Sequence, residues 1–218
     1  MSDSDSFIEE VNDEVRRDRL YGYIREYGWI AVLAVVLLVG GAAYSEWRAA
    51  QERAAAQATG DAILSALELE EAEARVEALD AIPSDDPGAR AIAGLMQSAA
   101  ALDAGGTEEA ADALQAMANT PDLPDHYREL AILKRAILLS GSLTPEARIE
   151  MLGPLTAPGA PYALLAGEQI ALAEAEQGDT DAAISRLRAI LDEEGVSAGL
   201  RRRASQLIVA LGGDLSAS

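Results

Sequence analysis

The amino-acid sequence predicts an all-α protein, with one N-terminal transmembrane helix followed by an α-solenoid of about four helix pairs and a C-terminal capping helix. An uncharged apolar stretch over residues 27–45 predicts the transmembrane helix. A helix-type pattern that recurs at intervals of 38, 37 and 36 residues predicts the solenoid. Ala, Leu and Glu, which all favour helix, dominate the composition. We therefore expect a tail over 1–26, a span over 27–47 and a helical repeat domain over 48–218.

The stretch over residues 27–45 has the length and the flanks of a membrane span. Its 19 residues form a helix about 28 Å long, close to the ~30 Å hydrocarbon core of a bilayer. Aromatic rings, which prefer the headgroup level, stand at both ends. Gly41 and Ser45 form a small-x-x-x-small pair, which lets a second membrane helix approach closely but also arises by chance. The predicted span residues include Tyr27, Gly28, Trp29, Gly41, Tyr44, Ser45 and Trp47.

Two other interpretations of this apolar stretch are weaker. A buried core helix is rarely apolar on every side for five turns in so small a protein. A cleavable signal peptide has a short basic segment and an apolar run of about 7 to 15 residues. This apolar run is longer, and it follows a 26-residue leader in which acids outnumber bases by 8 to 4. A membrane anchor is therefore the prediction.

Arginines near the span predict its orientation. Four precede it and two follow it, at Arg16, Arg17, Arg19 and Arg25 and at Arg48 and Arg53. The positive-inside bias then keeps the N-terminus in the cytoplasm and the remainder outside. After Glu26 the chain holds 29 acids and 13 bases, a net charge of −16, which argues against nucleic acid as a partner. Cysteine is absent, so neither disulfides nor thiol chemistry are expected.

A short amphipathic helix is predicted in the tail. Ser6 and Glu9 have the spacing of a capping box, which opens a helix. Such a helix would carry one apolar stripe without a core of its own, and would bind the membrane surface or a groove of a cytoplasmic partner. A frayed tail is an equal alternative, because short helices are marginal alone. The stripe consists of Phe7, Ile8, Val11 and Val15.

Four segments of the outer domain align as repeats of a helix-turn-helix unit. In each, a small residue is followed four positions later by a larger apolar one, which allows a second helix to cross closely. We therefore expect the alanines of the later units to be buried at helix crossings. The aligned pairs are Ala72 and Val76, Ala110 and Leu114, Ala147 and Met151, and Ala183 and Leu187.

Turn residues separate the helices of each unit. Gly105, Gly141 and Gly178 are expected to adopt the left-handed conformation that ends a helix. The residues expected to cap the following helices are Thr107, Thr144 and either Asp179 or Thr180.

Two of these turns resemble the tetratricopeptide repeat family. Residues 105–111 and 178–184 read Gly-Gly-Thr-Glu-Glu-Ala-Ala and Gly-Asp-Thr-Asp-Ala-Ala-Ile, close to the Gly-Asp-x-x-x-Ala pattern of that family. The first helices depart from it: Ser98 and Ala171 replace a glycine, and Ala101 and Glu174 replace a tyrosine. The resemblance implies a degenerate tetratricopeptide-like array of slightly lengthened period, whose first helices line a concave groove.

The order of the parts is similar to a second family, over essentially the whole chain. A short acidic leader with the pair Arg16-Arg17, one span and such an array resembles the YfgM-type ancillary subunits of the bacterial Sec translocon. That resemblance implies an inner-membrane protein whose periplasmic repeats meet exported polypeptides and periplasmic chaperones. A transmembrane regulator of the anti-sigma or sensor type is one alternative, although 26 residues are too few for an independent cytoplasmic core. An assembly scaffold for another envelope complex, such as cytochrome c maturation, is the other.

The inventory of reactive side chains argues against an enzyme. His126 is the only histidine and cysteine is absent, which excludes imidazole metal sites and thiol nucleophiles. No phosphate loop or dinucleotide fingerprint occurs. We expect no cofactor, no metal and no small-molecule substrate.

The tetratricopeptide resemblance also gives candidate residues for a protein-binding groove. A groove with apolar centres and a few charges suits extended or partly folded polypeptide. The alternative is that its leucines only complete the core. Counting back from the second-helix alanines gives Ile92, Leu95 and Ala99 in one unit and Leu165, Glu168 and Leu172 in another. In the unit between, where the loop after Gly141 is one residue longer, counting from the turn gives Arg128, Ala131 and Arg135.

The last helix predicted by the sequence carries three consecutive arginines, Arg201 to Arg203. A polar capping helix that closes the solenoid is the first interpretation. The second is an electrostatic contact with an acidic neighbour, inside the array or on a partner.

Overall fold

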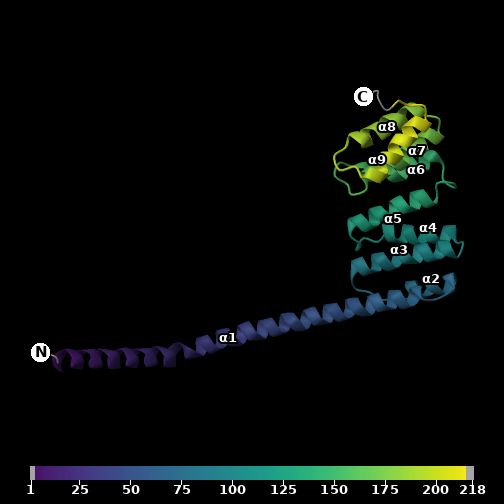
Figure 1. Ribbon diagram of the computed structural model, residues 1–218. Coiled ribbons are helices and arrows are strands. Elements are labelled where there is room, and N and C mark those ends of the chain that lie inside the picture. The colour runs from purple at the N-terminus through teal and green to yellow at the C-terminus, as the bar shows by residue number, and fades with distance from the viewer. Residues whose placement is uncertain (1–2, 215–218) are drawn as a thin grey trace. The chain divides into compact units, whose positions relative to one another are not determined.

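The computed structural model describes residues 3–214, with side chains over 27–30 and 32–214, and all regular structure in this part is helical. The chain forms two compact units, residues 1–55 and 56–218. The first contains most of α1, and the second contains the end of α1 and all later elements (Figure 1). The elements are α1 (Asp3–Leu67), α2 (Ala72–Asp80), α3 (Pro87–Asp103), α4 (Thr107–Ala118), α5 (Asp125–Leu138), α6 (Pro145–Leu152), the 3-10 helix η1 (Gly153–Thr156), α7 (Ala163–Glu176), α8 (Thr180–Asp192) and α9 (Ala198–Ala210).

The N-terminal helix α1 is continuous, so the predicted tail helix, the span and the segment after it are one element. The side chains of the predicted tail stripe lie outside the described residues. Side chains over residues 32–48 are all exposed, and Leu38 is 74% exposed. From Tyr27 onward α1 is long and apolar enough to cross a membrane. Ion pairs follow this stretch, between Arg48 and Glu52 at 3.1 Å and between Arg53 and Glu46 at 3.0 Å.

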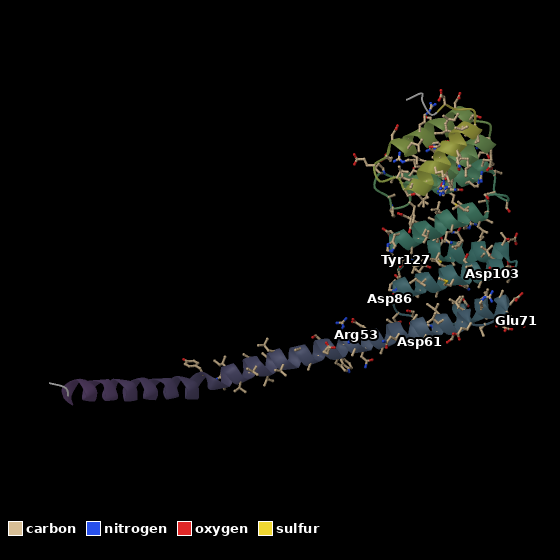
Figure 2. All side chains as sticks on the ribbon, viewed as in Figure 1. Arg53, Asp61, Glu71, Asp86, Asp103 and Tyr127 are labelled. Atoms are coloured by element: carbon tan, nitrogen blue, oxygen red, sulfur yellow. The ribbon has the colours of Figure 1, made fainter. Side chains whose placement is uncertain are left out.

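Helices α2 to α9 pack in chain order, each against the next, and further contacts join α3 to α5 and α5 to α7. Four clusters of buried apolar side chains follow one another along this stack. The last turns of α1 contribute Ile63 and Ala66 to the first cluster, against Leu79 of α2. Asp86 and Tyr127, which precede α3 and open α5, lie at the same edge of the stack (Figure 2). The two helices therefore run in the same direction.

The four helices α2–α5 and the four helices α6–α9 are two copies of one arrangement. Three of the four counterpart helices begin 73 residues apart, and α3 and α7 end 73 residues apart. The motif Glu-Ala-Arg-x-Glu-x-Leu occurs in both α2 and α6, at 73–79 and 146–152. Gly105 and Gly178, also 73 residues apart, both have a positive φ, at 85° and 87°. An internal duplication therefore underlies the second unit.

The duplication corrects the predicted repeat register. Ala110 and Ala183 are fully buried, as predicted, but Ala72 and Ala147 are only half-buried. Alanine is so frequent that matching one alanine to another did not define a unique register. At the fourth and eighth residues of these helices stand Arg75 and Leu79 in α2, Ala110 and Leu114 in α4, Arg148 and Leu152 in α6, and Ala183 and Leu187 in α8, and all of these except the partly buried Arg75 are buried.

The two arginines at these crossings tie each short helix to the helix after it. The Arg148 side chain is 5% exposed and pairs with Glu176, the last residue of α7. The Arg75 side chain is 18% exposed, and its Nη2 lies 3.4 Å from Oδ2 of Asp103, the last residue of α3. Arg75 also donates hydrogen bonds to the carbonyl oxygens of Leu69 and Glu70, both at 3.0 Å. In both copies, therefore, an arginine of the short helix pairs with the last residue of the long helix that follows.

The predicted turn chemistry is partly confirmed. Thr144 and Asp179 cap α6 and α8, accepting backbone N–H bonds at 3.3 and 3.2 Å. Thr107 is instead the first residue of α4, with Gly106 at the N-cap. Gly141 does not have a positive φ, because α5 ends at Leu138 and the chain leaves it through Leu139 and Ser140.

Candidate protein-binding groove

Two hollows lie along the helices α3, α5, α7 and α9, and we call them together the groove. The smaller hollow, of about 250 Å³, lies between α3 and α5 with Leu114 of α4 at its base. The larger, of about 580 Å³, lies across α5, α7 and α9. Ile137 of α5 lines both, so the two hollows are adjacent along the stack.

Apolar side chains dominate the walls of the groove. Leu102, Ile137 and Leu165 line it and expose 42%, 45% and 38% of their surfaces. They are exposed because the buried faces of these helices are already occupied: on α5, Ala131 packs toward one core cluster and Leu133 and Ala136 toward the next. The groove therefore presents apolar side chains to solvent.

An ion pair forms one wall of the larger hollow. Glu168 of α7 is 4% exposed, and Arg203 of α9 holds it through Nε at 2.7 Å and Nη2 at 2.6 Å. This paired hydrogen bonding to the Glu168 carboxylate raises the pKa of the Arg203 guanidinium. Each charge compensates the other, so this pair adds no net charge to the groove. The second interpretation of the C-terminal arginines, a contact inside the array, is therefore correct for Arg203.

The smaller hollow contains a single charged side chain, that of Lys134 on α5. The other residues lining it are apolar or small: Ser98, Ala99, Leu102, Leu114, Ile137 and Leu138. The groove therefore combines apolar walls with one cation in the smaller hollow and one compensated ion pair in the larger.

The structure brings four of the sequence-derived candidates into the groove. Leu165, Glu168 and Leu172 line the larger hollow, and Ala99 lines the smaller. Leu95 instead packs against the core cluster that contains Leu114. Whether the groove binds polypeptide stays a prediction.

Arg128 and Arg135 do not line either hollow, and their assignment to the groove needs correction. Arg128 pairs with Asp125 at the start of α5, and Arg135 reaches Sδ of Met151 on α6 at 3.8 Å. The candidates on α5 were counted back from Gly141, whereas Ser140 occupies the place that glycine holds after α3 and α7. One residue of slip turns a helix by about 100°, enough to move a side chain off the groove.

Sequence reasoning missed Leu133, Lys134 and Ile137, which line the groove from α5. One feature of the sequence distinguishes Lys134. Lys134 is the only lysine in the chain, beside sixteen arginines.

The described residues thus define an all-helical protein with one helix suited to crossing a membrane and a helical domain with an apolar groove. Comparison of the chain with protein-family models, characterised proteins and solved structures finds no match. Among the described residues, no group of three or more His, Cys, Asp or Glu side chains is arranged to hold a metal ion.

Proposed function

We propose that this protein is a single-span scaffold of a bacterial inner membrane, whose helical domain binds other proteins in the periplasm. In this proposal the domain is a tetratricopeptide-like α-solenoid. Its support is the packing of α2 to α9 in chain order, the contacts that link α3, α5 and α7, and the internal duplication. Each of these is typical of repeat arrays.

The groove is the observation that carries the proposal. Its exposed leucine and isoleucine side chains and its few polar groups suit extended or partly folded polypeptide, bound weakly. The net charge of −16 after Glu26 makes nucleic acid an improbable ligand.

The anchor and the order of the parts suggest where this binding takes place. The apolar stretch of α1 supports a membrane span, and the four-to-two arginine asymmetry supports a cytoplasmic N-terminus. From the resemblance to ancillary subunits of the Sec translocon, we propose the translocon, exported polypeptides and periplasmic chaperones as partners of this protein.

The test is site-specific photocrosslinking of the full chain in membranes. A photoreactive amino acid at Ile137 should give adducts with translocon subunits, chaperones or exported polypeptides. The matched control is Asp112, an exposed residue on α4. The same adducts from both positions, or none from Ile137, would remove the groove from the proposal. Adducts dominated by a regulatory factor or by cytochrome c maturation proteins would favour one of the two alternatives.

A further inference from the structure

We propose that the groove selects polypeptide segments in which an aspartate or glutamate side chain stands among apolar residues, and that Lys134 binds this carboxylate. The inference deepens the proposed function and rests on it. It starts from the one basic side chain of the groove that has no acidic partner.

Lys134 differs from the paired cations of the helical domain. Among the described side chains none forms a hydrogen bond or an ion pair with it. Acids outnumber bases by 29 to 13 after Glu26, yet no acid among the described side chains forms an ion pair with Lys134. Five arginines of the same domain do form ion pairs, namely Arg75, Arg128, Arg148, Arg186 and Arg203.

The surroundings of Lys134 are apolar. Lys134 lines the same hollow as Leu102, Ile137 and Leu138, and it is exposed to water while the hollow is open. The duplication gives a direct comparison, because the counterpart of Lys134 in the second copy, 73 residues later, is Leu207 of the larger hollow. The first copy therefore carries a cation where the second carries an apolar side chain.

This arrangement discriminates between ligands through desolvation. A purely apolar segment that covers the hollow removes water from the ammonium and gives nothing in return, which weakens its binding. A segment with a carboxylate at that point forms a charge-assisted hydrogen bond instead. A segment with a cation there meets a like charge. Since Arg203 is already compensated by Glu168, Lys134 is the uncompensated charge of the groove and decides the preference.

The position of Lys134 points to a side-chain carboxylate rather than to a chain terminus. Residues of α3 line its hollow on one side, and Ile137 leads into the larger hollow on the other. A bound segment that follows the groove can thus continue past Lys134 in both directions.

The test measures binding of three capped, fluorescein-labelled dodecapeptides to the full chain in nanodiscs of zwitterionic lipid. The peptides alternate leucine with serine and differ only in a central Asp, Asn or Lys. We expect the Asp peptide to bind about tenfold more tightly than the Asn peptide, and the Lys peptide to bind most weakly. A fourth peptide, with central Asn and a free C-terminal carboxylate, should bind like the capped Asn peptide.

Three variants make the assignment specific. Lys134→Glu should reverse the order of the Asp and Lys peptides, whereas Lys134→Arg should preserve it. Arg202→Glu makes the same charge change on an exposed position of α9 outside both hollows, and should leave the ratios unchanged. Circular dichroism of each variant checks that helicity is retained.

The unique lysine gives a second readout. A carbodiimide joins an amine and a carboxylate in contact as an amide with loss of water, so it should link Nζ of Lys134 to the Asp peptide. Lys134→Arg should bind this peptide but give no such adduct.

Equal binding of the Asp and Asn peptides to the wild-type chain would overturn the inference and leave the proposed function intact. Tighter binding of the free C-terminal peptide than of the capped Asn peptide would overturn the choice of a side-chain carboxylate. Absence of binding by every peptide, together with no adducts from the photoreactive amino acid at Ile137, would overturn the proposed function as well.

Discussion

At the scale of single residues, the least expected feature is the arginine at two helix crossings where the other two crossings carry alanine. Arg148 is almost fully buried, and its Nε has no hydrogen-bond partner among the described atoms. A buried guanidinium is tolerated only while a carboxylate compensates it. The Glu176 carboxylate does so from a half-exposed position.

This asymmetry predicts unequal effects of removing the two partners. Glu176→Gln leaves the guanidinium buried without a counter-charge, and should lower the free energy of unfolding by about 3 kcal/mol. Arg148→Met leaves a carboxylate that is 49% exposed and stays hydrated, so a loss of about 1 kcal/mol is expected. Denaturant unfolding of the full chain in detergent measures both.

Glu150→Gln, at an exposed position on α6, is the control for the charge change and should be neutral. An equal or smaller loss for Glu176→Gln than for Arg148→Met would mean that Arg148 is hydrated in solution.

At the scale of elements, α7 carries one glycine inside the helix and one just beyond it, and their backbones differ. A Cβ atom on Gly167 would meet Cδ1 of Ile190 at 3.4 Å, an ordinary contact. Gly178 has a φ of 87°, which disfavours any residue with a Cβ atom.

The same substitution should therefore have opposite effects at these two positions. Gly167→Ala should raise the free energy of unfolding by about 0.5 to 1 kcal/mol through helix propensity, and Gly178→Ala should lower it by about 1 kcal/mol. Thermal unfolding of the full chain distinguishes the signs. In the other copy, a Cβ on Gly94 would lie 2.8 Å from Sδ of Met117, so Gly94→Ala should be less favourable than Gly167→Ala. Identical shifts for Gly94 and Gly167 would show that Met117 moves without cost.

The element scale also shows how far the sequence predicted the fold and the groove. Periodicity, composition and turn residues were sufficient for the helices, because each helix carries its own local signals. Of the residues counted back from the second-helix alanines, those on α7 line the larger hollow, whereas Ile92 and Leu95 on α3 line neither hollow. On α5 the count was made from Gly141, which lies one residue beyond the position that Gly105 and Gly178 occupy and does not have a positive φ.

Packing across the duplication was not predictable from the alanines alone. The motif that contains Arg75 and Arg148 was the more specific evidence of the duplication. The chain has few bases, so two segments share an arginine by chance less often than they share an alanine. The pairing of Glu168 with Arg203 depends on how α9 packs relative to α7 in three dimensions. The spacing of residues along the chain does not predict this packing.

At the scale of the whole molecule, the proposed function depends on which side of the membrane the helical domain lies. The arginines around the apolar stretch of α1 predict a cytoplasmic N-terminus, with a margin of four to two. The absence of cysteine allows a direct test, because a single introduced thiol is the only one in the chain.

Ser142→Cys, in the exposed turn after α5, should react with a membrane-impermeant maleimide in cells whose outer membrane alone has been opened. Ser4→Cys in the tail should react only after the inner membrane is dissolved. Replacing Arg16, Arg17, Arg19 and Arg25 with Glu should weaken or reverse this pattern, because the retained arginines then lie after the span. Labelling of Ser4→Cys and not of Ser142→Cys in the wild-type background would place the groove in the cytoplasm. Exported polypeptides and periplasmic chaperones would then be ruled out as its ligands, and the regulator hypothesis would have to be reformulated with the tail as the sensing part.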